Sequence, residues 1–240
     1  MTTSKIGNFT FAKHVHHVLI ANEFILLDEA RDRYILVDES DSKQLLIGFA
    51  ESKTTAAIMK YQSAGLIELS GEPERLNVFS GQRHGIGNHV WADVGSFRKT
   101  PYGSDTFFSA LALVILMKLS ILIIGFSYTL RLARRLKLKK PTSPKKNNHF
   151  IENSKIEEMA AAIYFAGLKL PFKIQCLESS LALFFYATVL NINSTLKIGV
   201  QRYDFLAHAW IEIEEKVIAD DPELKTAMPV ILIIEPRSNR

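Results

Sequence analysis

The C-terminal half of the chain carries four patterned runs: CLESSLALFFYATVL at residues 176–190, LKIGV at 196–200, FLAHAWIEI at 205–213 and KVIAD at 216–220. The first run contains no Pro or Gly, and its apolar content favours a buried helix. The three shorter runs are rich in β-branched residues, and the third alternates, as antiparallel strands do. We therefore expect one helix packed on a small antiparallel sheet.

Cys176 is the single cysteine of the 240 residues, which excludes a disulfide framework and a Cys-rich zinc site. It falls in the first turn of the predicted helix, where free backbone N–H groups and the helix dipole favour a thiolate over a thiol. Cys176 is therefore either a packing residue or a nucleophile, and its neighbours in the fold decide between the two.

A histidine follows on the predicted strand 205–213, and the next strand carries a carboxylate. A three-residue turn between the strands places Glu212 opposite Lys216 and His208 opposite Asp220. A two-residue turn instead places Asp221 opposite His208 and mismatches the other pairs. The first register joins opposite charges and apolar partners, so we predict that Asp220 orients His208.

Cys176, His208 and Asp220 are the parts of a Cys-His-Asp triad, in the chain order of papain-like and transglutaminase-like hydrolases. His208 takes the proton of the thiol, and Asp220 fixes its tautomer. The backbone N–H of Cys176 is the expected oxyanion donor, with the side chain of Gln175 as a further candidate. We expect no metal site and no directly bound cofactor.

These runs resemble the leader peptidases of lasso-peptide biosynthesis, the microcin J25 maturation protease family. The resemblance rests on four segments: CLESSLAL from Cys176, LKIGV from Leu196, FLAHAWIE from Phe205 and VIADDP from Val217. It covers roughly residues 170–223 and implies that Cys176, His208 and Asp220 are the family's catalytic residues. Gln201 and Ala219 replace the Arg and Asn that the family often has, and both lie outside the triad.

The N-terminal part is predicted to form strands over 17–28 and 33–38, helices over 43–50 and 56–64, and a strand-like exit over 66–69. Asp41 or Ser42 is the expected cap of the first helix and Thr54 or Thr55 that of the second, with Gly65 as the stop. This small unit resembles, more weakly, the winged-helix-like leader-recognition domain that accompanies such peptidases.

The second resemblance implies that a leader peptide adds as a strand to the edge of the unit. The edge would be formed by Tyr34, Ile35, Leu36 and Val37, and the adjoining packing face by Ile58 and Tyr61. The same apolar residues could instead form the core of the unit.

The fold class expected is α+β: a leader-recognition domain at 1–72, a linker at 73–105 and a peptidase domain at 106–240. A further helix is predicted over 154–167, between Ser154 as cap and Gly167 as stop. The apolar segment 107–130, interrupted by Lys118, has three interpretations: a membrane span, a buried helix with Lys118 reaching solvent and Gly125 allowing a break, or a helix that docks through 107–146 on a membrane or a partner. A charge at mid-span is costly in a bilayer, which favours the buried or peripheral reading.

The net charge of +4 comes from one local stripe, because residues 131–146 carry eight basic side chains and no acidic one. The rest of the chain has 21 basic against 25 acidic residues. An acidic remainder and a stripe without interleaved aromatic residues argue against nucleic-acid binding. The N-terminus lacks the pattern of a secretory signal, so we expect a cytoplasmic protein, with membrane association through the stripe left open.

The function predicted is a cysteine peptidase that binds a ribosomal precursor peptide by its leader and cleaves leader from core. The resemblance implies a partner, an asparagine-synthetase-like cyclase that uses ATP. Residues 81–87 lack the Lys-Ser/Thr of a phosphate-binding loop, so any ATP requirement is expected to enter through that partner. The alternatives are a transglutaminase-like acyl or amide transferase, and a non-enzymatic winged-helix-like regulator or membrane-associated adaptor.

Overall fold

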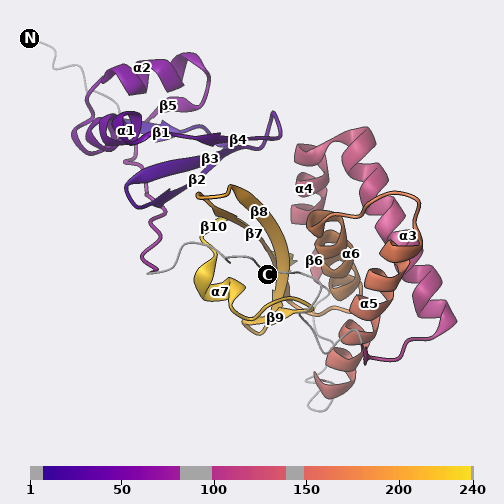
Figure 1. The fold of residues 1–240 in the computed structure, drawn as a ribbon. Helices are drawn as coiled ribbons and strands as arrows, with labels where there is room; N and C mark the ends of the chain where they lie inside the picture. Colours follow the sequence, from indigo (N-terminus) through magenta and orange to yellow (C-terminus); the bar gives the residue numbers. More distant parts are fainter. Residues whose placement is uncertain (1–7, 82–98, 139–148, 239–240) are drawn as a thin grey trace, which may run out of the picture.

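A computed structural model describes residues 8–81, 99–138 and 149–238 of the chain (Figure 1). Helices and strands mix along the sequence, and the α+β class is confirmed. The N-terminal unit runs β1 (Asn8–Phe11), β2 (Val15–Ile20), β3 (Glu23–Asp28), β4 (Arg33–Leu36), α1 (Glu39–Glu51), α2 (Ala56–Ser63) and β5 (Ile67–Ser70). Strands β2, β3 and β4 form an antiparallel meander, and β1 pairs with β5. The winged-helix-like assignment of this unit stays a prediction.

Local signals explain the boundaries of this unit. The run 17–28 is two strands, because Ala21 and Asn22 adopt φ values of 49° and 65° and close a tight hairpin. Helix α1 begins earlier than predicted, since Asp38 Oδ1 accepts from the N–H of Asp41 and caps it. Thr55 caps α2, as predicted. Gly65, at φ 73°, turns the chain into β5.

The sheet β2-β3-β4 is covered on both faces. One face carries Phe24 and Leu26, which pack with α1 and α2 in the core of the N-terminal unit. The opposite face carries Ile25 and Leu27, which belong to the hydrophobic core of the C-terminal half. The N-terminal unit is therefore joined to the rest of the chain through a shared apolar core.

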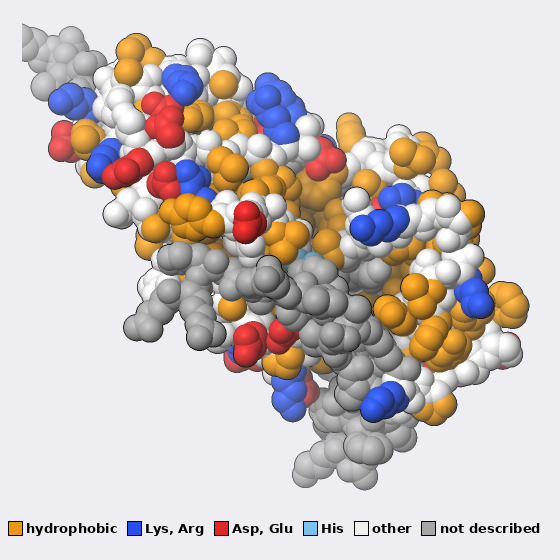
Figure 2. Space-filling model, viewed as in Figure 1, with side chains coloured by type: hydrophobic (Ala, Val, Ile, Leu, Met, Phe, Trp, Pro, Cys, Tyr) orange, Lys and Arg blue, Asp and Glu red, His pale blue; other side chains and the backbone are white. Residues whose placement is uncertain are grey.

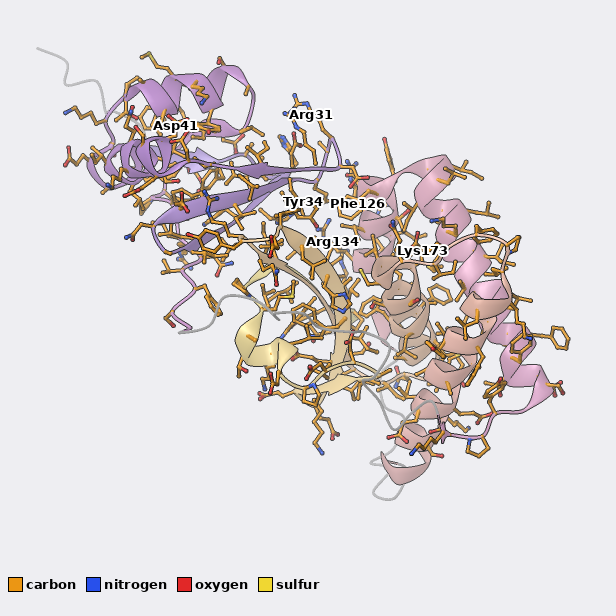
Figure 3. All side chains as sticks on the ribbon, in the orientation of Figure 1. Arg31, Tyr34, Asp41, Phe126, Arg134 and Lys173 are labelled. Atoms are coloured by element: carbon orange, nitrogen blue, oxygen red, sulfur yellow. The ribbon has the colours of Figure 1, made fainter. Side chains whose placement is uncertain are left out.

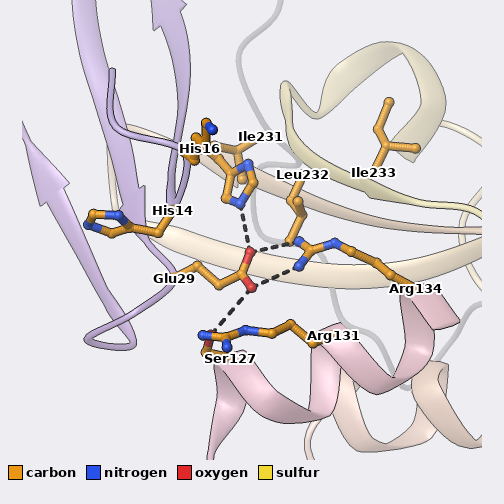
Figure 4. Close-up of a pocket in the computed structure, with 10 residues that line it drawn as sticks. His14, His16, Glu29, Ser127, Arg131, Arg134, Ile231, Leu232 and Ile233 are labelled. Atoms are coloured by element: carbon orange, nitrogen blue, oxygen red, sulfur yellow. Dashed lines mark hydrogen bonds and ion pairs between the residues drawn. The ribbon is translucent and has the colours of Figure 1, made fainter. Parts of the chain in front are cut away.

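A buried ion pair fixes the same junction (Figure 4). Both guanidinium nitrogens of Arg134 donate to the carboxylate of Glu29, at 2.8 and 2.6 Å, and Glu29 is only 5% exposed. His16 Nε2 lies 2.7 Å from Glu29 Oε2. Burial raises the pKa of Glu29, but the hydrogen bonds from Arg134 and His16 outweigh it and lower that pKa to about 2. Glu29 therefore stays ionised and ties the two parts together.

Part of the predicted linker also takes part in this junction. Asn77 Nδ2 donates to the carbonyls of His17 and Val230, at 3.1 and 2.8 Å. Val78 forms an isolated parallel bridge with Leu19. The chain after β5 thus bridges the N-terminal meander and the C-terminal sheet, while residues 82–98 lie outside the described residues.

The apolar segment is not one uninterrupted helix. It forms α3 (Ser104–Leu119), a π-helical turn η2 (Ser120–Ile124) and α4 (Phe126–Arg135), followed by β6 (Lys137–Leu138). Gly125 adopts φ 86° and interrupts the helix between η2 and α4, as predicted for this glycine. Within the described residues, Ser104–Ile124 is long and apolar enough to cross a membrane by length and composition.

The C-terminal half completes the fold with α5 (His149–Lys169), α6 (Cys176–Val189), β7 (Ser194–Gln201), β8 (Leu206–Ile213), β9 (Lys216–Ile218), α7 (Leu224–Ala227), β10 (Val230–Ile234) and β11 (Arg237–Ser238). The prediction of a helix over 154–167 is too short at both ends: α5 begins before Ser154 and continues through Gly167. The predicted helix from Cys176 is confirmed as α6.

An antiparallel sheet in the order β10-β7-β8-β9 forms the centre of this half. Helices α3, α5 and α6 lie together beside it (Figure 1). The predicted alternation of β8 is confirmed: Ala209, Ile211 and Ile213 join the main core, and Trp210 packs with Leu224 and Met228 in a separate cluster. One face of the sheet therefore packs against α6, and the other face packs against α7.

Candidate active site

Cys176 is the first residue of α6, where the sequence predicted it to be. The preceding residue, Gln175, is the N-cap, and its backbone N–H donates to Glu178 Oε2 at 2.8 Å. Ser180 Oγ, one turn further along, donates to the carbonyl of Ala209 on β8 at 2.8 Å. The first turn of α6 is thus fixed both to its own cap and to the strand that carries His208.

His208 and Asp220 lie next to Cys176. His208 is 6% exposed, and its Nε2 lies 2.7 Å from Asp220 Oδ2. His208 and Cys176 line the same cavity, and a hydrogen bond between their side chains shifts the pKa of both groups. The structure therefore brings together the three residues that the sequence singled out.

The hairpin that delivers Asp220 has a register different from the predicted one. The observed pairs are Ile213 with Lys216 and Ile211 with Ile218, so the turn has two residues. Glu214 and Glu215 both adopt positive φ, 48° and 62°, as a tight hairpin turn requires. Two consecutive glutamates lack the usual Asn-Gly signal for such a turn, and the side-chain pairing argument therefore chose the wrong register.

Asp220 nevertheless reaches His208, for a reason that strand pairing does not include. Strand β9 ends at Ile218, and Ala219 adopts φ 58°, so regular pairing stops before Asp220. The chain turns at Ala219 and directs the carboxylate of Asp220 to His208. The prediction of the partner residue agrees with the geometry, whereas the predicted pairing was wrong.

The electrostatics favour a thiolate beside an imidazolium. Burial alone raises the pKa of the Cys176 thiol, but the hydrogen bond and charge of His208 and backbone hydrogen bonds from Ala209 and Leu177 hold it below its ordinary value. Burial alone lowers the pKa of His208, but Asp220 and Cys176 raise it to about 9. Opposite shifts of two neighbouring groups are typical of an activated nucleophile with its base.

A cavity of about 570 Å³ opens onto these residues. Its walls come from α5, the start of α6, β8 and the loop after β9, and they are mostly apolar. The lining includes Tyr164, Lys173, Gln175, Ser179, Trp210 and Ile218. An extended peptide segment could therefore lie along Cys176 with its side chains in an apolar groove.

The proposed oxyanion donors stay predictions. The N–H of Cys176 is at the N-terminus of a helix, where it has no intrahelical acceptor. Gln175 lines the same cavity as Cys176 and directly precedes it in the chain.

The residues predicted to bind a leader divide into two groups. Strand β4, which contains Tyr34, Ile35 and Leu36, is an edge strand of its sheet. Val37 is fully buried, as is Ile58, and Tyr61 is 6% exposed with its hydroxyl hydrogen-bonded to Asp41. Ile58 and Tyr61 therefore belong to the core of the N-terminal unit and do not form an exposed packing face.

Tyr34 connects this edge to the site. It lies at the junction between the N-terminal sheet and the C-terminal half (Figure 3), and its ring centroid is 5.3 Å from that of Phe205, in the turn between β7 and β8. Burial, then the neighbouring charge of Cys176, raise the pKa of its phenol. The edge of β4 thus leads to the immediate surroundings of Cys176.

Two functional neighbours were not predicted as such. Glu178, 2% exposed, receives Lys118 Nζ at 2.8 Å on Oε1 and the Gln175 N–H on Oε2. The buried-helix interpretation expected Lys118 to reach out to solvent. Its side chain is 29% exposed, but its ammonium group turns to the start of α6 and pairs with Glu178. The signal for Glu178 was its place three residues after the N-cap, which is the spacing of a capping box.

Comparison with known proteins supports the same family. Residues 114–232 match the model of the transglutaminase-like superfamily. The microcin J25-processing protein McjB of Escherichia coli is 38% identical over 60 residues, which cover 25% of this chain and 29% of that protein. The match thus spans less than a third of that relative's length. No solved structure matches the chain significantly. These findings confirm the resemblance to the lasso-peptide leader peptidases.

Proposed function

We propose, from the premise that this chain carries a transglutaminase-like domain and is related to a microcin J25-processing protein, that it is a cysteine peptidase of lasso-peptide maturation. It binds a ribosomal precursor peptide by its leader and cleaves the bond between leader and core. The observation that carries the proposal is that Cys176, His208 and Asp220 line one cavity, with His208 Nε2 2.7 Å from Asp220 Oδ2.

The geometry supports a two-step hydrolysis. The thiolate of Cys176 attacks the carbonyl of the last leader residue, and the N–H of Cys176 stabilises the oxyanion. The imidazolium of His208 then donates its proton to the leaving amine, which is the N-terminus of the core peptide. Neutral His208 next removes a proton from water, which attacks the thioester and releases the leader carboxylate. Asp220 holds the ring in the orientation that both steps need.

Leader capture by β4 is supported by the direction of its hydrogen-bonding groups. The N–H of Val37 donates to the carbonyl of Phe24 on β3. Because antiparallel pairs alternate, the N–H and C=O groups of Leu36 and Tyr34 point away from β3, to the free edge. An incoming leader strand would pair with these groups. Its C-terminal continuation would pass Tyr34 and enter the cavity at Cys176.

The same proposal includes the partners and the compartment. The precursor peptide is the substrate, and an asparagine-synthetase-like cyclase receives the released core. Any ATP requirement enters through that cyclase. Reduced Cys176 is the active form, which suits a cytoplasmic protein.

Mass spectrometry of a precursor peptide incubated with the protein tests the proposal. We expect loss of cleavage in Cys176→Ala and His208→Ala and a large reduction in Asp220→Asn, with leader binding retained in all three. Met59→Ser, a change at an exposed side chain of α2, serves as the matched control and should cleave normally. Each variant is assayed with and without ATP and the cyclase. Cleavage by Cys176→Ala at the wild-type rate would contradict the mechanism.

A second function uses the same triad. The superfamily of the matched domain is named for acyl transfer, and a thioester on Cys176 can be attacked by an amine as well as by water. The products distinguish the two reactions: hydrolysis gives a free leader carboxylate, whereas transfer joins the leader to the amine. A released leader whose mass is that of the free carboxylic acid supports the peptidase.

A further inference from the structure

The end of the helical layer where α3 meets α4 exposes large apolar side chains. Leu122 and Ile123 are 75% and 74% exposed, more than any other large apolar residue in the described part of the chain. We call this surface the apolar corner, and it consists of Leu119, Leu122, Ile123, Ile124, Tyr128 and Leu132, each at least 44% exposed. Figure 2 shows hydrophobic side chains gathered over this end of the molecule, with basic side chains beside them.

The local backbone explains why this surface is exposed. The π-helical turn η2 has no buried residue, and Gly125 then reverses the chain into α4. Helix α4 buries Phe126, Leu130 and Ala133, and its remaining face points outward. The corner is thus a projecting turn with exposed apolar side chains.

Basic side chains border the apolar corner. Arg131 and Arg135 are exposed on α4, and the guanidinium of Arg131 lies 4.7 Å from the ring centroid of Tyr128. Along the sequence, no acidic residue occurs between Asp105 and Glu152, while residues 131–146 carry eight basic ones. The surface therefore combines projecting apolar groups with positive charge.

We propose that the apolar corner docks on the surface of an anionic lipid bilayer and holds the protein at the membrane as a peripheral protein. The exposed leucine and isoleucine side chains enter the boundary between headgroups and acyl chains, and Arg131 and Arg135 pair with lipid phosphates. Positive charge at the rim complements an anionic surface. It opposes association of two copies through the same corner, since their arginines would face each other.

The structure favours docking over a transmembrane span of α3. Ala110 and Val114 of α3 are fully buried in the core, and the helix packs against α5 and α6. Lys118 is paired with Glu178 at the start of the catalytic helix. A spanning α3 would have to separate from α6 and break this ion pair, whereas insertion of the corner leaves both in place.

Vesicle flotation of the purified full chain tests the inference. We expect binding to vesicles of phosphatidylglycerol and phosphatidylcholine, at least tenfold weaker binding to phosphatidylcholine alone, and release by high salt. Leu122→Ser/Ile123→Ser and Arg131→Gln/Arg135→Gln should each weaken binding at least tenfold. The matched controls are Met59→Ser/Leu69→Ser and Lys53→Gln/Arg75→Gln, which change exposed side chains elsewhere and should bind as the wild type does.

The result does not depend on the proposed peptidase activity, because flotation reads lipid binding alone. Circular dichroism of each variant confirms that the fold is kept. Three results would overturn the inference: no flotation of the wild type, equal flotation of Leu122→Ser/Ile123→Ser, or retention of the wild type on the vesicles after alkaline extraction, which marks an integral span. Sedimentation showing a wild-type dimer that Leu122→Ser/Ile123→Ser dissociates would also overturn it and assign the corner to a second copy.

Discussion

The ammonium group of Lys118, in the middle of the most apolar segment of the chain, lies 2.8 Å from Oε1 of Glu178, two residues after Cys176. Oε2 of the same carboxylate accepts the N–H of Gln175. One buried carboxylate thus links α3 to the N-cap of α6. The lysine that looks misplaced in an apolar segment helps to hold the first turn of α6.

The ion pair predicts a specific pattern of stability. Lys118→Met leaves Glu178 buried without its countercharge. Because the Lys118 side chain is 29% exposed, we expect a loss of about 2–3 kcal/mol in the free energy of unfolding, less than for a fully buried pair. Lys118→Met combined with Glu178→Gln removes both charges and should recover part of the loss. Urea denaturation of the two single variants and the double variant measures the coupling. The exposed pair of Lys43 with Glu39 is the control, and Lys43→Met should leave the free energy of unfolding nearly unchanged.

Lys118→Met is also expected to change the reactivity of Cys176. Lys118 holds the carboxylate of Glu178. If this pair contributes only to stability, iodoacetamide alkylates Cys176 in the folded Lys118→Met variant at the wild-type rate. If the carboxylate positions the first turn of α6, alkylation slows while leader binding is kept. We expect slower alkylation, because the thiol depends on backbone hydrogen bonds from Leu177 in that turn.

Activity should follow a bell-shaped dependence on pH. The rising limb reports ionisation of Cys176, whose pKa is held below its ordinary value, so this limb lies at a lower pH than for an ordinary thiol. The falling limb reports loss of the proton from His208, whose pKa is raised to about 9. In Asp220→Asn the falling limb should move to lower pH, because the carboxylate that stabilises the imidazolium is gone. A profile of kcat/KM from pH 5 to 10 measures both limbs, and an unmoved limb in Asp220→Asn contradicts the assignment of Asp220.

The raised pKa of His208 also affects stability. Since its folded value lies above the unfolded value of 6.5, the contribution is complete below pH 6.5 and is lost as the pH rises through about 9.

The site could be predicted from the sequence because each of its parts has a local signature. A cysteine at the start of an apolar helix, an alternating strand with one histidine and an aspartate soon after are all visible in a single sequence. The hairpin register could not be predicted, since Glu214, Glu215 and Ala219 adopt positive φ without glycine or asparagine to indicate it. The partner of Lys118 could not be predicted either, because 60 residues separate it from Glu178.

In the fold, too, features with a local sequence signature could be predicted, and long-range contacts could not. Strand and helix positions followed local patterns, whereas the shared core between the two halves depends on which face of the meander meets which helix. Ile58 and Tyr61 were assigned to a surface by analogy, yet they are buried in the N-terminal unit. A periodic apolar pattern identifies a buried face but does not say whether the unit itself or a partner covers it.

The junction between the halves should weaken in acid. Glu29 has a pKa lowered to about 2 from the ordinary 4.5, so its contribution to stability is complete above pH 4.5 and is lost as the pH falls through about 2. Glu29→Gln removes the charge and should cost about 2 kcal/mol at neutral pH. Urea midpoints at pH 7 and pH 3 measure the effect, and the difference between wild type and Glu29→Gln should shrink at pH 3. An equal difference at both values would show that the ion pair is not the cause.

Leader capture by the edge of β4 can be tested at one backbone group. The N–H of Leu36 points away from β3, so Leu36→Pro removes a donor of the free edge and leaves the pairing of β3 with β4 intact. We expect at least tenfold weaker leader binding and a raised KM, with the alkylation rate of Cys176 unchanged. Leu36→Ala keeps the N–H and is the matched control, since Leu36 is 48% exposed and little packing is lost. If Leu36→Pro binds leader as the wild type does, the leader does not pair with this edge, even where cleavage still depends on Cys176.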